Sequence, residues 1–281
     1  MIMTTWFITG ASDGIGRQVT ERLLARGDRV AATARRPHRL DDLAAAFPGL
    51  LWTAALDVSD PAAIRTVVDR AFAELTTIDV IFSNAGRAAF GAAEELTDAT
   101  VADQIAVNMT GPIHLVRAVL PHLRAQGGGR IIQNSSMGAQ ISSPGGSLYH
   151  AAKWGLEGFL ESVIGEVAPF GIGVTMVEPG TVRTGFGAAM TIAPGLDAYA
   201  GTPVGQIRRS IEGSGGNLTG AAPGDPARVA AAIIDAASAT PAPRRLVLGS
   251  DAYQAVHTAL TTRLTELRAG EHLAATTDFP S

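Results

Sequence analysis

A tyrosine and a lysine in the middle of the chain are spaced so that they could carry out proton chemistry together. Lys153 is the only lysine and lies four positions after Tyr149, one of three tyrosines. Positions i and i+4 of a helix share a face, so both side chains can point to one place. A neighbouring ammonium stabilises a phenolate, so we expect the pKa of Tyr149 to fall from about 10 towards neutrality. Tyr149 is therefore a candidate general acid or base.

The choice of lysine at position 153 supports the same interpretation. All other Lys/Arg positions are arginine, whose planar, permanently charged guanidinium differs from the compact ammonium of lysine. A lone lysine suggests a task that arginine cannot perform. The alternative is a surface lysine that follows a tyrosine by coincidence, and the spacing alone leaves that alternative open.

Three glycines near the N-terminus are spaced for binding a phosphate group. They follow the first apolar run and open the first helical pattern, in the string Thr-Gly-Ala-Ser-Asp-Gly-Ile-Gly over residues 9–16. Glycines let the backbone turn tightly and let a pyrophosphate approach the helix N-terminus, where N–H groups and the helix dipole hold an anion. The spacing alone is a weak signal, and its place between strand and helix strengthens it. We expect a dinucleotide to contact Gly10, Ser12, Asp13, Gly14, Ile15 and Gly16.

The end of the second apolar run bears on which nucleotide is preferred. Residues 32–36 read Ala-Thr-Ala-Arg-Arg and lack the acidic residue that would bind the ribose 2′-hydroxyl of NAD. A nearby arginine can hold a 2′-phosphate instead, so Arg35, helped by Ser12 and Arg36, favours NADP(H) as cofactor. Use of NAD(H) stays open. The alternative is that both arginines are solvated residues at the start of the next helix.

Short apolar runs alternate with longer amphipathic patterns over most of the chain. Apolar strands that alternate with helices are typical of a parallel sheet covered on both faces, so we predict an α/β, doubly wound parallel sheet of about seven strands. Gly27 and Gly127 stand where helix C-termini need a left-handed residue, and Asp60 before Pro61 is typical of a helix start. The predicted strands are 5–9, 29–33, 50–56, 80–83, 130–134, 173–177 and 245–248, and the predicted helices are 15–25, 40–47, 61–75, 100–124, 148–168, 225–238 and a pattern over 253–267.

We expect one domain over residues 1–281, because no linker or internal repeat divides the chain. Residues 185–224 are rich in Gly, Ala, Pro and Ser, which is typical of a substrate lid. Residues 251–281 form a C-terminal helix and a polar tail, which we expect to lack regular structure from Ala269 onwards. Four apolar lid residues could line a substrate pocket or merely pack the lid: Met190, Ile192, Leu196 and Tyr199.

Composition excludes several classes of function. A formal net charge of −4 with 17% charged residues offers no basic footprint for nucleic acid. The chain has no cysteine and its six histidines are scattered, so we expect no metal site. No apolar run reaches transmembrane length and no leader pattern opens the chain, so we expect no membrane contact and a cytoplasmic location.

Several separated motifs occur in one order, and together they resemble the short-chain dehydrogenase/reductase family in its compact single-domain branch. The resemblance covers about residues 5–250 and implies a Rossmann-type fold. Ser83 departs from the pattern, because the family often has a second Asn there. The motifs are TGxxxGxG at 9–16, Leu56-Asp57-Val58, Asn84-Ala85-Gly86, Asn108, Ser136, Tyr149-x-x-x-Lys153 and Pro179-Gly180-x-x-x-Thr184.

The resemblance implies a role for each catalytic position. Tyr149 is the general acid for carbonyl reduction or the base for alcohol oxidation, and Lys153 lowers its pKa and binds the nicotinamide ribose. Ser136 binds the substrate oxygen. Asn108 interrupts its helix and holds a water that connects Lys153 to solvent. Around the cofactor, the resemblance places Asp57 and Val58 by the adenine, Asn84, Ala85 and Gly86 by the adenosine ribose, and Pro179, Gly180, Val182 and Thr184 by the nicotinamide.

The resulting prediction is an NADP(H)-dependent oxidoreductase acting on a hydrophobic ketone, aldehyde or secondary alcohol, assembled as a homodimer or homotetramer. One alternative is a nucleotide-sensing or scaffolding protein on the same fold, although such proteins typically lose the Tyr or the Lys. Another is a sugar-nucleotide epimerase or dehydratase, a class with TGxxGxxG spacing and a larger C-terminal domain that this chain lacks. His150 follows Tyr149 on the helix and points about 100° away, so we expect a packing or subunit-interface role rather than catalysis.

Overall fold

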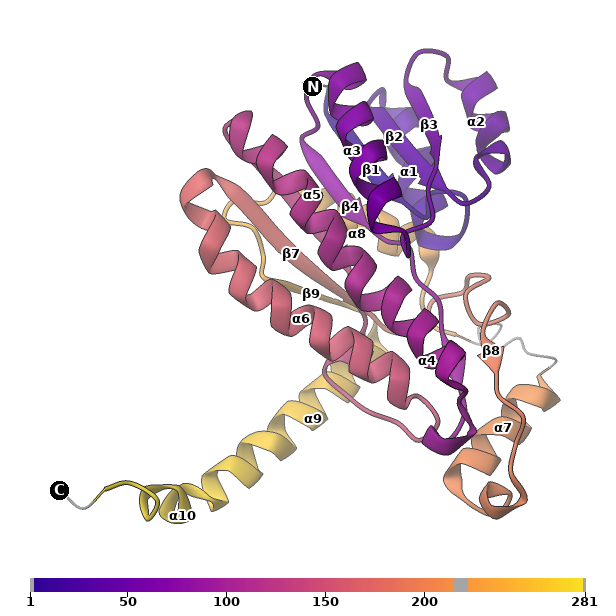
Figure 1. Cartoon of the computed structure of the whole chain (residues 1–281), viewed down its shortest axis with the longest axis vertical. Coiled ribbons are helices and arrows are strands. Elements are labelled where there is room, and N and C mark those ends of the chain that lie inside the picture. The colour runs from indigo at the N-terminus through magenta and orange to yellow at the C-terminus, as the bar shows by residue number, and fades with distance from the viewer. Residues whose placement is uncertain (1–2, 215–221, 280–281) are drawn as a thin grey trace.

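A seven-stranded parallel sheet forms the centre of the molecule (Figure 1). The computed structural model describes residues 3–214 and 222–279. The strand order is β3-β2-β1-β4-β6-β7-β9, and every neighbouring pair is parallel. The predicted doubly wound sheet is therefore confirmed. The strands are β1 (Thr5–Thr9), β2 (Arg29–Ala34), β3 (Leu51–Ala55), β4 (Val80–Ser83), β6 (Gly129–Asn134), β7 (Ile172–Pro179) and β9 (Arg245–Leu248).

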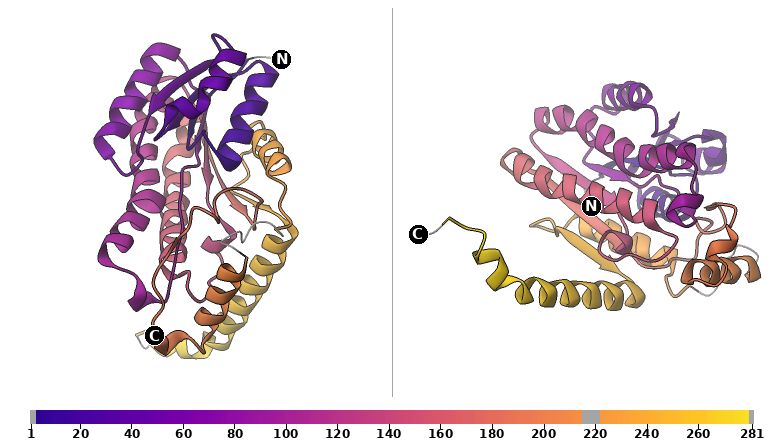
Figure 2. Two further views of the ribbon diagram at one scale, coloured as in Figure 1. Left: turned by 90° about the vertical axis from the view of Figure 1, so that its right-hand side faces the viewer. Right: turned by 60° about the horizontal axis from the view of Figure 1, so that its bottom comes forward.

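Helices cover both faces of the sheet, as Figures 1 and 2 show. On one face, α3, α5 and α6 enclose a core that includes Phe7, Phe72 and Leu156. On the other face, α1 and α8 enclose a second core that includes Trp6 and Ile233. The helices of this framework are α1 (Gly14–Arg26), α2 (Asp41–Ala46), α3 (Pro61–Leu75), α4 (Asp98–Ile105), α5 (Gly111–Ala125), α6 (Ser147–Val167), α8 (Pro226–Ala237) and α9 (Ser250–Ala269).

The first strand shows why the sheet must be covered twice. All five residues of β1 are buried, with Phe7 facing one core and Trp6 and Ile8 facing the other. Side chains alternate across a strand, so an apolar run has to bury both of its faces. Each large apolar side chain buried in this way contributes about 1.5–3 kcal/mol, which is more than strand propensity supplies.

The predicted helix ends are confirmed. Gly27 ends α1 with a φ of 90°, and Gly127 after α5 has a φ of 89°. In this left-handed region glycine lacks the steric penalty of other residues. Asp60 caps α3 by accepting hydrogen bonds from the N–H groups of Ala62 and Ala63 at 2.8 and 3.0 Å, with Pro61 in the first turn.

Three stretches differ from the sequence prediction. The single helix predicted over 100–124 is two helices, α4 and α5, joined by a π-helical turn over Ala106–Thr110. The lid contains a helix, α7 (Pro203–Gly213), and a short strand, β8 (Thr191–Ile192), which pairs with β5 (Ala89–Phe90). The tail contains a further helix, α10 (Glu271–Ala275), so the expectation of no regular structure there is wrong. Part of the predicted lid, 215–221, lies outside the described residues.

The C-terminal helix leaves the body of the molecule. In Figures 1 and 2, α9 runs from the end of β9 away from the sheet and carries α10 at its far end. Its base is anchored by buried Ala252 and Val256, whereas Leu264 and Leu267 on its outer half are exposed.

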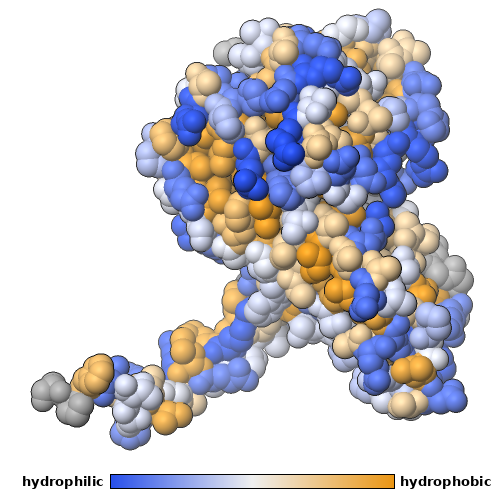
Figure 3. All heavy atoms as spheres, viewed as in Figure 1, coloured by the Kyte–Doolittle hydropathy of each residue, from blue (hydrophilic) through white to orange (hydrophobic). Residues whose placement is uncertain are grey.

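Apolar side chains also gather over the α5–α6 face in Figure 3. Among the described residues, no helix combines the length and apolar character needed to cross a membrane.

The close approach of α1 to the first strand predicts a large effect of one methyl group. A Cβ at Gly16 would lie 2.3 Å from the Gly10 carbonyl oxygen and 2.5 Å from Asn84 Nδ2. Gly16→Ala should therefore lower the free energy of unfolding by about 1–3 kcal/mol. A Cβ at Gly165, on the exposed side of α6, would meet nothing within 4 Å, and Gly165→Ala should stabilise the protein by about 0.5–1 kcal/mol. Urea unfolding of both variants tests this, and equal midpoints would contradict it.

Candidate active site

A cavity of about 580 Å³ opens at the carboxyl ends of the strands. Ligands of open parallel sheets bind at this edge, where the chain connections diverge to opposite faces. The loop after β1, the ends of β2, β4, β6 and β7, and the start of α6 all contribute to its wall. Of the residues predicted to bind a cofactor or substrate, these line it: Gly10, Ser12, Asp13, Gly14, Ile15, Arg35, Asp57, Val58, Asn84, Ala85, Gly86, Ser136, Tyr149, Lys153, Pro179, Gly180, Val182 and Thr184.

The glycine loop lies on the floor of this cavity. Gly10 and Gly14 have φ values of 67° and 53°, in the left-handed region that favours glycine. Gly16 lies behind the loop, where its missing side chain lets α1 approach β1. Asp13 caps α1 by accepting a hydrogen bond of 2.7 Å from the Gly14 N–H. The loop therefore has the backbone shape of a phosphate-binding turn, with one of its N–H groups engaged by Asp13.

Amide side chains join the ends of three strands beside the loop. Asn84 Nδ2 donates to the Thr9 carbonyl oxygen at 3.0 Å, and Asn134 Nδ2 donates to Asn84 Oδ1 at 3.0 Å. The Asn84 N–H also bonds the Thr9 hydroxyl at 2.9 Å. These contacts hold the carboxyl ends of β1, β4 and β6 in one arrangement.

Three arginines line the rim of the cavity beyond β2. Arg35 and Arg36, which the sequence analysis proposed, are both exposed there. The third is Arg39, whose Nη1 lies 3.7 Å from Asp13 Oδ2. Sequence reasoning missed Arg39, which lies in the 3₁₀ turn Pro37–Leu40 just after the two proposed arginines. The rim is therefore more basic than predicted, which suits an anionic group.

Ser136, Tyr149 and Lys153 lie together although they come from two elements. Ser136 begins the turn Met137–Ala139 after β6, and its Oγ accepts a hydrogen bond of 3.0 Å from the Gly138 N–H. Tyr149, in the first turn of α6, is hydrogen-bonded to Ser136. Lys153 is 4% exposed; its Nζ donates to the Asn134 carbonyl oxygen at 2.9 Å and lies 5.8 Å from the centre of the Tyr149 ring. A hydroxyl, a phenol and an ammonium thus face one cavity.

The electrostatics of this group differ from the sequence expectation. The pKa of Tyr149 is raised above its ordinary value, because burial disfavours the phenolate more than the hydrogen bond with Ser136 favours it. The predicted fall of the Tyr149 pKa is therefore wrong for this arrangement. Burial lowers the pKa of Lys153 to about 8, and the negative charge of Glu157 opposes that change. The lysine, rather than the tyrosine, has the pKa nearer neutrality.

Asn108 lies behind the cavity wall rather than in it. It is fully buried in the π-helical turn, so the predicted interruption of the helix is confirmed. Its Nδ2 donates to the Arg87 carbonyl oxygen at 2.6 Å, and its Oδ1 accepts from the Arg87 N–H at 3.0 Å. Its side chain thereby fixes the loop after β4. The water relay suggested for Asn108 stays a prediction.

His150 has a packing role, as expected. Its Nδ1 lies 2.8 Å from the Gly138 carbonyl oxygen, and its Nε2 lies 3.1 Å from the Ser143 N–H nitrogen. These contacts fasten the loop that carries Ser136 to the start of α6. A Cβ at Gly138 would lie 3.1 Å from the Tyr149 ring and 3.2 Å from Ser136 Oγ, so this glycine permits the close approach of the two hydroxyls.

The lid side of the cavity is formed by residues that sequence reasoning did not choose. Phe186 packs edge-on against Tyr149, with ring centroids 6.2 Å apart, and Ala189 and Thr191 also line the cavity. The four apolar lid residues do not line it: Met190 and Tyr199 pack in a lid core with Phe90 and Val204, and Ile192 and Leu196 are 39% and 47% exposed. Met190 and Tyr199 therefore pack the lid, and none of the four residues lines the cavity. The only signal for Phe186 was its place two residues after the Pro-Gly-x-x-x-Thr motif.

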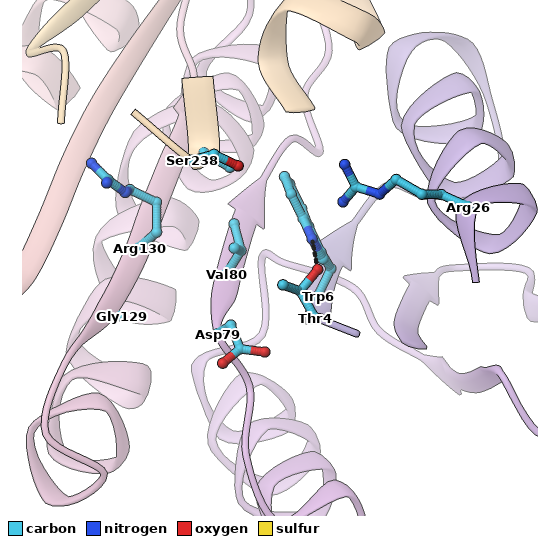
Figure 4. Close-up of a pocket in the computed structure, with 9 residues that line it drawn as sticks. Thr4, Trp6, Arg26, Asp79, Val80, Gly129, Arg130 and Ser238 are labelled. Carbon is cyan, nitrogen blue, oxygen red and sulfur yellow. Dashed lines mark hydrogen bonds between the residues drawn. The ribbon is translucent and has the colours of Figure 1, made fainter. Parts of the chain in front are cut away.

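A second, smaller cavity of about 280 Å³ lies at the opposite, amino edge of the sheet. Figure 4 shows Arg26 and Arg130 on opposite sides of Trp6, whose Nε1 donates to Thr4 Oγ1 at 3.2 Å. Arg130 Nη2 is bound to the Ala239 carbonyl oxygen at 2.7 Å. These side chains tie the strand starts together, and the edge on which ligands of parallel sheets bind is the other one.

Comparison with known proteins agrees with this architecture. The family model for short chain dehydrogenase matches residues 4–193. Oxidoreductase BOA17 of Botryotinia fuckeliana is 36% identical over 251 residues, which are 89% of this chain and 90% of that protein. A short-chain dehydrogenase of Streptomyces avermitilis, known from its crystal structure, is 41% identical and covers 98% of both chains with a TM-score of 0.90.

An alcohol dehydrogenase of Thermococcus sibiricus, complexed with 5-hydroxy-NADP, shares the fold at 24% identity. The alignment covers 88% of this chain and 96% of that protein with a TM-score of 0.71. The chain belongs to the short-chain dehydrogenase/reductase family and is an oxidoreductase of that family.

The crowding around Gly138 predicts a specific loss of activity. In Gly138→Ala the new methyl group must displace Tyr149 or Ser136 by a few tenths of an ångström. Because small misplacements of reacting groups are costly, kcat should fall about tenfold or more. Gly158→Ala, on the open side of α6, is the matched control and should keep wild-type turnover. Steady-state kinetics with a reducible carbonyl compound tests the pair; equal kcat values would refute the role of Gly138.

Proposed function

We propose that the protein is an NADP(H)-dependent oxidoreductase that transfers hydride between the nicotinamide and a hydrophobic ketone, aldehyde or secondary alcohol, with Tyr149 as general acid or base. The observation that carries this proposal is the convergence of Ser136, Tyr149 and Lys153 on the cavity that also contains the glycine loop. A proton donor and a nucleotide-shaped cradle facing one space are what carbonyl reduction requires.

The residues present fit a dinucleotide. The left-handed Gly10 and Gly14 leave a floor without side chains, where a pyrophosphate would lie against the start of α1. Asp57 and Val58 would hold the adenine, and Asn84, Ala85 and Gly86 the adenosine ribose. Pro179, Gly180, Val182 and Thr184 also line the cavity and would hold the nicotinamide. When bound, that ring supplies or accepts the hydride.

Side chains of the protein would donate the proton to the substrate and take it up again. Ser136 Oγ accepts the Gly138 N–H, and its own hydrogen stays available as a donor, to Tyr149 in this arrangement and to a substrate oxygen when one is bound. Tyr149, kept in its neutral form by burial, is ready to donate its proton to that oxygen. Lys153 lies beside the tyrosine ring and would stabilise the phenolate that forms. We propose that Asn108 positions a water that returns the proton to this group.

The preference for NADP(H) is supported by the basic rim of the cavity. Arg35 and Arg36 are exposed there, and Arg39 lies close by. A planar guanidinium is suited to binding a 2′-phosphate. Solved structures of the same fold are complexed with 5-hydroxy-NADP, with NADH and with NAD. Use of NAD(H) alongside it stays open.

A hydrophobic substrate is supported by apolar residues that line the cavity, namely Met137, Phe186 and Ala189, of which Phe186 packs against Tyr149.

We also propose a homodimer or homotetramer, supported by the apolar α5–α6 face in Figure 3 and by Trp154, which is 42% exposed on α6. A cytoplasmic location is part of the same proposal and rests on the sequence alone.

Removal of one hydroxyl group tests the catalytic proposal. Tyr149→Phe should lower kcat for carbonyl reduction at least about 100-fold, because the proton donor is lost, while the Kd for NADPH stays within about threefold. Tyr253→Phe, at a tyrosine 64% exposed on α9, is the control and should behave like the wild type. NADPH oxidation gives the turnover of each variant, and fluorescence titration gives its Kd for NADPH. Undiminished turnover in Tyr149→Phe would show that Tyr149 is not the proton donor.

Removal of one positive charge tests the cofactor proposal. Arg35→Ala should raise the KM for NADPH about 10-fold or more and leave the KM for NADH nearly unchanged, because only NADPH carries the 2′-phosphate. Arg22→Ala, at an exposed arginine of α1 that does not line the cavity, is the control. An equal rise of the KM values for NADPH and NADH in Arg35→Ala would mean that Arg35 does not bind the 2′-phosphate.

A further inference from the structure

A group of buried charges lies directly behind Ser136 and Lys153. Glu157 follows Lys153 by one turn of α6 and is 3% exposed, and Glu178 in β7 is fully buried. Arg245 of β9 contacts both carboxyl groups, with its Nε 3.2 Å from Glu157 Oε2 and 3.0 Å from Glu178 Oε1. Burial of charged groups is strongly unfavourable unless they are paired, so their place beside a catalytic group calls for a physical reason.

Glu157 is held by donors from three directions. Its Oε1 accepts a hydrogen bond of 2.6 Å from Ser135 Oγ, and its Oε2 accepts one of 2.8 Å from Gln140 Nε2. Arg245 completes the set through Nε and Nη2, both at 3.2 Å. Ser135 immediately precedes Ser136, and Gln140 ends the turn that Ser136 begins. Glu157 thereby fixes the loop that presents the Ser136 hydroxyl.

Glu178 adds a neutral hydrogen-bonding group to this arrangement. Burial, repulsion by Glu157 and a hydrogen bond with Glu157 together raise the pKa of Glu178 to about 7, against the opposing charge of Arg245. Glu178 is therefore mostly protonated and neutral below pH 7, and it is ionised at higher pH.

The group around Glu157 contains charges of both signs. Arg245 contacts Glu161 as well as Glu157. Arg244 pairs with Glu161 at 3.1 Å on the outer side. From α9, Arg263 donates to the Gln140 carbonyl oxygen at 2.7 Å. The groups that face Glu157 are therefore Lys153 and Glu161 on α6, Ser135 and Gln140 in the loop after β6, Glu178 on β7 and Arg245 on β9.

Lys153 needs a nearby negative charge because its own site disfavours the ammonium. It is almost fully buried, and it donates a hydrogen bond to the neutral Asn134 carbonyl oxygen. Burial lowers the pKa of Lys153 to about 8, and Glu157 is the charge that opposes the change. Without Glu157 the ammonium would lose its proton closer to neutral pH, and Tyr149 would lose its neighbouring cation.

We propose that Glu157 is a positioning residue for the Ser136–Tyr149–Lys153 group: its buried carboxylate, held by Ser135, Gln140 and Arg245, keeps the Lys153 ammonium charged. The consequence for catalysis rests on the proposed function. The electrostatic role of Glu157 can be measured without any substrate.

The single lysine makes that measurement direct. Protein grown with [ε-¹³C]lysine has one lysine Cε resonance, because Lys153 is the only lysine in the chain. In the wild type its chemical shift should titrate with a midpoint near pH 8. In Glu157→Gln the midpoint should fall by about one pH unit, because the attraction of one buried charge is lost. Glu161→Gln removes a carboxylate that also contacts Arg245, one turn further along α6, and should leave the midpoint nearly unchanged.

Turnover provides a second measurement. In the direction of carbonyl reduction, kcat/KM should fall as pH rises through the Lys153 midpoint, and in Glu157→Gln this alkaline limb should move to lower pH by the same amount. Glu157→Asp keeps the charge and should restore most of the wild-type profile. A purely structural role for Glu157 would lower kcat/KM equally at every pH and would not move the limb.

Each outcome decides one question. An unchanged Lys153 midpoint in Glu157→Gln, or an equal fall in Glu161→Gln, overturns the inference. If Glu157→Gln does not fold because Arg245 is left unpaired, the same change is made in an Arg245→Met background and compared with Arg245→Met alone. A wild-type protein that shows the Lys153 titration but reduces no carbonyl compound would remove the proposed function and leave the electrostatic role of Glu157 intact.

Discussion

The meeting of parallel strand ends at one edge of the sheet is the constraint on which the site depends. β1 lies between β2 and β4, so consecutive connections leave this edge towards opposite faces and open a crevice between them. The crevice keeps its shape because Asn84 and Asn134 join the ends of β1, β4 and β6 through hydrogen bonds of 3.0 Å. Ser136, the glycine loop and the start of α6 all line this crevice. The glycine loop is far from the other two along the chain.

Burial sets the chemistry of the groups that the crevice collects. It keeps Tyr149 in its neutral form and draws the pKa of Lys153 towards neutrality, so the two pKa values lie further apart than those of two exposed side chains would. The carbonyl group of Asn134 and the carboxylate of Glu157 offset part of the cost of the buried ammonium. Sequence spacing could place Tyr149 and Lys153 on one helical face, but it could not say which of the two would be perturbed more.

The lid and helix α9 are attached to the sheet by contacts outside its two hydrophobic cores. The lid is held to the body by the pairing of β5 with β8 and by Glu95, whose buried carboxylate contacts Arg208 of α7 and accepts the Leu196 N–H at 2.8 Å. Phe90 and Ala92 also pack with Val204 and Ile211 of α7 in the lid core. Helix α9 contacts the body through its buried base and through Arg263, which donates to the Gln140 carbonyl oxygen at 2.7 Å. Such elements determine access to a cavity rather than the fold around it.

Local sequence patterns were enough to predict the alternation of strands and helices, the parallel sheet, the glycine turn and the pairing of Tyr149 with Lys153. Each of these features depends on short-range periodicity or on one special residue type. The burial of these groups and their contacts with distant residues could be seen only in the folded structure. Burial reversed the expected direction of the Tyr149 pKa, Arg39 joined the basic rim, and Phe186 rather than the four chosen lid residues came to line the cavity. Solvent exclusion and contacts between distant segments arise only when the chain is packed, so local patterns carry little information about them.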